Sequence, residues 1–143
     1  MEEQTVQRNF FQRLLGRPAT SGPADTTCWA YADGRVVIDL SRAAELQQPG
    51  GAFRLESDTL PTRLLIVHGE DGVYRAFRNR CTHMGRRLDP IPGTNRVQCC
   101  SIGKTTYGPD GEVIGGSGKR PLTVLPVRPE NGSLIVDLGS VRP

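Results

Sequence analysis

The sequence of 143 residues contains no long hydrophobic run and no strong excess of one charge. Because a membrane-spanning helix needs about 20 consecutive apolar residues, we expect no transmembrane segment. Residues 1–12 lack the basic start, the apolar stretch and the small-residue cleavage site of a secretory signal, so we expect a cytoplasmic protein. The net charge of +3 is too small to predict nucleic-acid binding by itself, and we expect none.

Histidines are also scarce, since the chain has only His68 and His83. A mononuclear iron site of two histidines and one carboxylate would need both of them. Neither a Ser/His/Asp set nor a glycine-rich phosphate loop is recognisable. The sequence therefore predicts no catalytic machinery of its own.

Turn-forming residues are plentiful, because 17 glycines and 11 prolines make up about a fifth of the chain. This composition favours many short elements over long helices. Pairs of strand-like runs flank turn signals at residues 33–34, 69–72 and 129–132, and each pair predicts a β-hairpin. We expect an all-β fold in which an antiparallel scaffold supports the loops that carry the chemistry.

The first 27 residues differ from the rest of the chain. Residues 5–15 place apolar side chains at helical spacing, which predicts a short amphipathic helix. Residues 19–27 have the small, polar composition of a linker. The helix can pack on its own domain, dock a partner or lie on lipid, although it has no strong cationic face. We expect two units: residues 1–27, and a β domain formed by residues 28–143.

The four cysteines are more typical of metal ligands or redox groups than of disulfides in a cytoplasmic protein. Cys81 lies two residues before His83, and the adjacent pair Cys99 and Cys100 follows in a second glycine-containing segment. Thiolate and imidazole donors on two such loops suit zinc or an iron-sulfur cluster. Cys28 stands apart and is interpreted as a small buried hydrophobic residue.

Two segments resemble the cluster-binding loops of Rieske [2Fe-2S] proteins: residues 77–88, with the sequence FRNRCTHMGRRL, and residues 97–122. The family pattern is Cys-x-His followed by Cys-x-x-His, in which two cysteines hold one iron and two histidines hold the other. The resemblance extends over about residues 28–139. It implies a Rieske-like antiparallel β-sandwich base, an inserted cluster-binding loop subdomain and a [2Fe-2S] cluster as cofactor.

The chain departs from this pattern because the second histidine is absent. If Cys100 is the second family cysteine, the segments align without a gap and Gly103 stands in the histidine's place. If Cys99 is that cysteine, Ile102 stands there and one extra residue follows. We prefer the gapless alignment. His68 is not a substitute, because the expected hairpin places it roughly 25 Å from the first loop, at ~3.3 Å per residue.

Three explanations of the missing ligand remain open. Cys99 can complete a set of three cysteines and one histidine, namely Cys81, His83, Cys99 and Cys100. Neighbouring residues on an extended chain point in opposite directions, so this set needs an irregular loop. Alternatively, Cys28 or a partner residue supplies the ligand, or the site has lost its metal while keeping the fold.

The resemblance implies a small electron-transfer protein of the ferredoxin type, and we expect its departure from the family pattern to give a ligand set of three cysteines and one histidine. Two alternatives are a cluster-free accessory or interaction subunit of a redox enzyme, and a zinc-stabilised form of the same loops. Residues 78–104 carry a net charge of +5, which is either an ordinary solvated surface or one that attracts an acidic redox partner. The N-terminal helix is a possible docking element for this partner.

Overall fold

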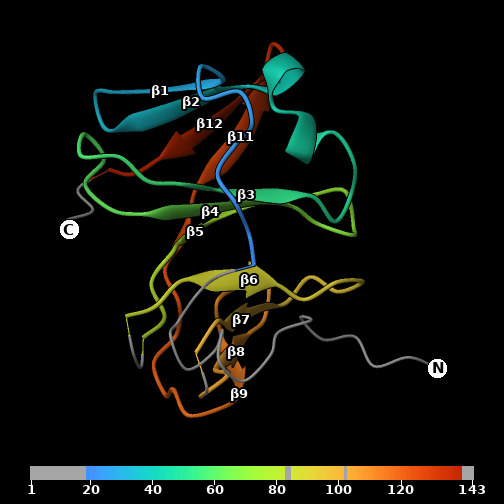
Figure 1. Ribbon diagram of the computed structural model, residues 1–143, viewed down its shortest axis with the longest axis vertical. Coiled ribbons are helices and arrows are strands. Elements are labelled where there is room, and N and C mark those ends of the chain that lie inside the picture. The colour runs from blue at the N-terminus through green and yellow to red at the C-terminus, as the bar shows by residue number, and fades with distance from the viewer. Residues whose placement is uncertain (1–18, 83–84, 102, 140–143) are drawn as a thin grey trace.

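The computed structural model of the chain describes residues 19–82, 85–101 and 103–139. Its strands form three antiparallel four-stranded sheets, which lie in three layers (Figure 1). The strands of the first sheet, in spatial order, are β1 (Trp29–Ala32), β2 (Arg35–Asp39), β12 (Ser133–Asp137) and β11 (Val127–Glu130). Two short 3-10 turns follow β2, η1 (Leu40–Arg42) and η2 (Ala44–Leu46).

The second sheet forms the middle layer, and the third is the smaller layer that carries the cysteine loops (Figure 1). The strands of the second sheet are β10 (Val124–Leu125), β5 (Tyr74–Arg78), β4 (Leu64–His68) and β3 (Ala52–Leu55). The strands of the third are β6 (Leu88–Pro90), β7 (Val97–Cys99), β8 (Thr106–Tyr107) and β9 (Val113–Gly115). This architecture confirms the expected all-β fold of a sandwich base with an inserted loop subdomain.

All three predicted hairpins are present. Asp33 and Gly34 join β1 to β2 with φ of 52° and 77°, and Asn131 and Gly132 join β11 to β12 with φ of 50° and 80°. Two consecutive positive φ angles are the mark of the type I′ turn, which Asp-Gly and Asn-Gly pairs favour. Residues 69–72 lie in the connection between the paired strands β4 and β5.

Strand β4 explains why one part of the sequence is apolar without alternation. Leu64 and Ile66 are buried in the core between the first and second sheets. Leu65 and Val67 point to the opposite face, into a second core between the second and third sheets. Because the strand is covered on both faces, its four apolar residues are buried without a break.

Residues 19–27 lie along the domain and reach from β1 to β6 (Figure 1). The N–H groups of Ala19 and Thr20 donate to the buried carboxylate of Asp89, at 2.9 and 2.7 Å. The carbonyl of Ser21 accepts from the N–H of Arg54, at 2.9 Å. The segment predicted to be a linker is therefore hydrogen-bonded to both the second and the third sheet. The predicted helix lies outside the described residues, and the division at residue 27 stays a prediction.

Candidate metal centre

The first cysteine loop connects β5 to β6 and is closed by its own backbone. Cys81 donates its N–H to the carbonyl of Arg86, at 2.7 Å, and accepts at its own carbonyl from the N–H of Gly85, at 2.9 Å. Gly85 has a φ of 69°, which a residue with a side chain adopts only with strain. The glycine thus permits the tight turn that holds Cys81 in place.

Arg63, which precedes β4, clamps this loop from the middle layer. Its Nε donates to the carbonyl of Asn79, at 3.0 Å, and its Nη2 donates to the carbonyl of Gly85, at 2.7 Å. The buried Asn79 side chain in turn accepts from the N–H of Leu88, at 2.7 Å. Both ends of the loop are therefore fixed by buried or half-buried hydrogen bonds, which hold the donor residues in a defined position.

The second loop begins where β7 ends, at Cys99. The N–H of Cys99 donates to the carbonyl of Thr105, at 2.8 Å, which closes this loop on itself. The N–H of Cys100 donates to the carbonyl of Arg87, at 2.9 Å, which joins it to the first loop. Pairing of Leu88 with Cys99 between β6 and β7 brings the two loops together.

Cys81 and Cys99 face each other in the second core. Both side chains are 1% exposed, and the two thiols are hydrogen-bonded to each other. The hydroxyl of Ser101 lies 3.0 Å from Sγ of Cys99. The hydrogen bond with Cys81, together with burial, raises the pKa of the Cys99 thiol, so a metal must displace its proton on binding.

The other two cysteines are placed differently. Cys100 is 1% exposed and lies close enough to Arg63 and Arg87 to interact electrostatically with both guanidinium groups. Cys28 is buried in the core between the first and second sheets, which confirms its interpretation as a buried small residue. None of the four cysteines forms a disulfide. The structure therefore separates Cys28 from the other three and disfavours it as a ligand.

Of the two histidines, His68 lies within the described residues and His83 does not. His68 stacks on Tyr74 with ring centroids 4.3 Å apart, and its Nδ1 lies 2.9 Å from the carbonyl of Leu46. His68 therefore lies at the end of β4 in the second sheet, where the predicted hairpin places it. His83 and Ile102 lie outside the described residues. Within the described residues, no three His, Cys, Asp or Glu side chains are grouped closely enough to hold a metal.

Sequence reasoning missed a set of hydrogen bonds that ties the first loop to β8. The N–H of Thr82 donates to the hydroxyl of Tyr107, at 2.9 Å, and the two hydroxyl groups are also 2.9 Å apart. Oγ1 of Thr82 donates to the carbonyl of Arg120, at 2.7 Å. Thr82 thus joins the loop of Cys81 both to the fully buried Tyr107 in β8 and to the segment that leads into β10. A tyrosine after the second loop was the only sequence signal.

Replacing Tyr107 with phenylalanine is expected to lower the melting temperature by about 3–6 °C, because the N–H of Thr82 loses its acceptor at a cost of about 1–2 kcal/mol. Thermal unfolding followed by circular dichroism measures this change. Tyr31→Phe is the matched control, because its hydroxyl makes no hydrogen bond within the described residues. Equal melting temperatures for Tyr107→Phe and the control would show that the hydroxyl does not stabilise the loop.

Comparison with known families decides what these loops are. The family model of the Rieske [2Fe-2S] domain matches residues 37–126, which include both cysteine loops and the middle layer. The chain belongs to this family. The resemblance stated from the sequence is thereby confirmed, and membership indicates a [2Fe-2S] cluster as cofactor, as the sequence predicted. No curated protein sequence matches the chain.

Solved structures share the fold at low sequence identity. The ferredoxin of Sphingomonas yanoikuyae is 21% identical, with a TM-score of 0.53, and the match covers 63% of this chain and 87% of that one. The carnitine-bound Rieske monooxygenase CntA is 24% identical, with a TM-score of 0.53, and the match covers 68% of this chain. It covers only 30% of the monooxygenase, so this chain matches less than a third of that protein.

The donors on the two loops fit such a cluster. The thiols of Cys81 and Cys99 meet at the point where the loops converge, and two facing thiolates are what one iron of a Rieske cluster requires. They are screened from solvent and backed by apolar side chains, which limits water access to a bound group. Family membership and this geometry together support an electron-transfer role of the Rieske type.

Proposed function

We propose that the chain is an electron-transfer protein whose [2Fe-2S] cluster is held by Cys81, His83, Cys99 and Cys100. The observation that carries this proposal is the contact between the buried thiols of Cys81 and Cys99. Two sulfur donors from separate loops meet there without forming a disulfide. In this assignment Cys81 and Cys99 hold one iron, and His83 and Cys100 complete the ligand set at the other. When bound, the cluster supplies one-electron redox chemistry.

The position of Cys100 supports its role as the ligand that replaces the missing histidine. Alternation of side chains along β7 places Cys99 on the core face, with Val97 two residues before it. The strand ends at Cys99, and Cys100 lies in a bend where alternation no longer applies. This irregular backbone is what a ligand set containing neighbouring cysteines needs. The hydrogen bond from Cys100 to Arg87 also keeps it beside the first loop.

The partner is proposed to be a redox protein that is acidic at the contact. One solved structure with the same fold is the complex of reduced oxygenase and oxidised ferredoxin in carbazole 1,9a-dioxygenase, in which the matched chain is 20% identical, with a TM-score of 0.54. That match covers 63% of this chain and 91% of the other. We also propose a cytoplasmic location and docking through the N-terminal helix. Among the described residues, no helix is long and apolar enough to cross a membrane.

Anaerobic purification followed by analysis of iron, acid-labile sulfide and zinc tests the proposed function directly. We expect two iron atoms and two sulfides per chain, a brown colour and a visible spectrum that bleaches on reduction. A colourless protein with one bound zinc would instead identify the zinc-stabilised form. A folded protein without any metal would identify the cluster-free interaction subunit. Either of these results would refute the electron-transfer proposal.

A further inference from the structure

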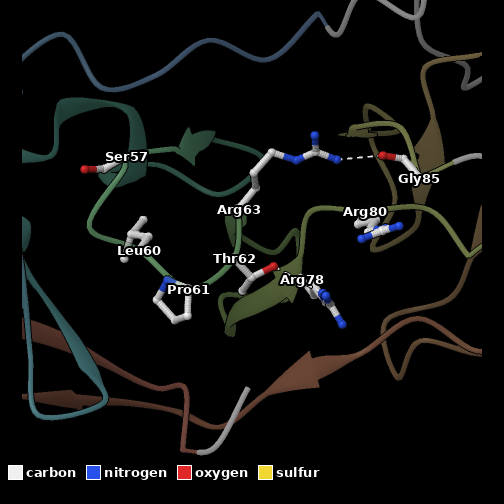
Figure 2. Close-up of a pocket in the computed structure, with 8 residues that line it drawn as sticks. All are labelled: Ser57, Leu60, Pro61, Thr62, Arg63, Arg78, Arg80 and Gly85. Atoms are coloured by element: carbon white, nitrogen blue, oxygen red, sulfur yellow. Dashed lines mark hydrogen bonds between the residues drawn. The ribbon is translucent and has the colours of Figure 1, made fainter. Parts of the chain in front are cut away.

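Two adjoining hollows open beside the loop that carries Cys81. The first, of about 470 Å³, is bounded by Ser57 and residues 60–63 on one side and by Arg78, Arg80 and Gly85 on the other (Figure 2). The second, of about 450 Å³, shares these last three residues and adds Cys81, Thr82, Arg120 and Thr123. We call the two together the arginine cleft. Its volume is in the range of ordinary binding pockets.

The arginine cleft is strongly positive. Arg63, Arg78, Arg80 and Arg120 line it, and its described lining contains no Asp or Glu. Two acidic residues adjoin this lining in the sequence without being part of it: the exposed Asp58, and Glu56, which forms ion pairs with Arg54 at 3.2 Å and with Arg87 at 2.5 Å. The charge of Glu56 is therefore paired with two arginines that do not line the cleft. Burial, followed by the neighbouring charges of Arg87 and Arg80, lowers the pKa of Arg63.

The positive charge also has a fixed geometry. Arg63 is held by two backbone carbonyls, and Nε of Arg78 donates to the hydroxyl of Thr62, at 3.1 Å. Arg80 packs against Gly85: its Nε lies 3.3 Å from the point where residue 85 would carry a Cβ if it had a side chain. Within the described residues, the exposed side chains of Arg80 and Arg120 make no hydrogen bond or ion pair. Donors are thus available for an anionic group from outside.

We propose that the arginine cleft is the docking site for carboxylate side chains of the electron-transfer partner, a protein that is acidic at this contact. Four arginines spread over two hollows match several carboxylates on one segment rather than a single small anion. Cys81 lines the second hollow, so a partner bound there lies against the loop of a cluster ligand. This inference rests on the proposed function and names the surface that performs it.

Binding of a fluorescently labelled ten-residue aspartate peptide to the holoprotein, followed by anisotropy at low ionic strength, tests this docking site. The double variant Arg80→Gln, Arg120→Gln is expected to bind the peptide about fivefold more weakly or worse, because it loses two exposed ion-pair donors. The matched control is Arg35→Gln, Arg42→Gln, which removes two exposed charges at the first sheet. The control is expected to bind within about twofold of the unmodified protein, since no direct contact is lost.

Three results would overturn the docking site: equal weakening in both double variants, no effect in either, or displacement of the peptide by inorganic phosphate at an equal concentration. The first two would show diffuse attraction, and the third a small-anion site. The cluster absorbance of the same samples reports the proposed function separately. A brown protein without arginine-dependent binding refutes the docking site alone, whereas a colourless protein refutes the electron-transfer function.

Discussion

Replacing either Cys81 or Cys99 with serine is expected to abolish the cluster, leaving a colourless protein with less than about a tenth of the original iron and sulfide. The two thiols face each other in the second core, and a serine hydroxyl is a much poorer donor to iron than a thiolate. Each substitution therefore removes one of the two sulfur donors from the same iron. Visible absorption and iron analysis after anaerobic purification measure the loss.

Cys28→Ser is the matched control for both substitutions. Cys28 is as deeply buried as Cys81, but it lies in the other core, so its replacement is expected to leave the spectrum unchanged. Cys100→Ser tests whether Cys100 is a cluster ligand in addition to Cys99. Loss of the cluster in Cys100→Ser supports the ligand set with three cysteines. If Cys28→Ser loses the visible spectrum of the cluster while Cys99→Ser keeps it, the assignment of the centre is refuted.

The reduction potential is expected to lie between those of two-histidine Rieske clusters and all-cysteine clusters, at roughly −400 to −150 mV. A cluster with three thiolates and one imidazole carries one more negative charge than the two-plus-two arrangement, and this charge opposes the uptake of an electron. Nearby Arg63 and Arg87 offset it only partly. Protein-film voltammetry measures the potential, and its pH dependence should show at most one ligand proton coupled to reduction.

Restoring the missing histidine provides the internal control for this potential. The contact between Cys81 and Cys99 favours Cys99 as the second family cysteine, so Ile102→His combined with Cys100→Ser should restore Cys-x-x-His and raise the potential. The pair Gly103→His with Cys99→Ser restores the same spacing from Cys100 and is expected to leave the potential without this rise. If only the Gly103 pair gains two-histidine character, the gapless alignment is right. A potential above −150 mV in the unmodified protein would contradict the ligand set with three cysteines.

The local features of this protein were determined by the sequence itself. Asp33-Gly34 and Asn131-Gly132 specify their hairpins because few other pairs adopt two consecutive positive φ angles. The order and spacing of Cys81, His83, Cys99 and Cys100, together with the residues of the two loops around them, carried the resemblance to the family, since both depend only on the order of residues along the chain. The continuous apolar run of β4 was also visible, although periodicity alone could not show that it faces two cores.

The tertiary structure alone decided which of two adjacent cysteines faces Cys81. That choice depends on the register of β7 against β6 and on where β7 ends, and a one-residue shift would exchange Cys99 for Cys100. The same limitation applies to Thr82, whose partners Tyr107 and Arg120 are 25 and 38 residues away. The arginine cleft is likewise formed by three segments that are separate in the sequence. Such contacts are set by packing between layers, which no local pattern encodes.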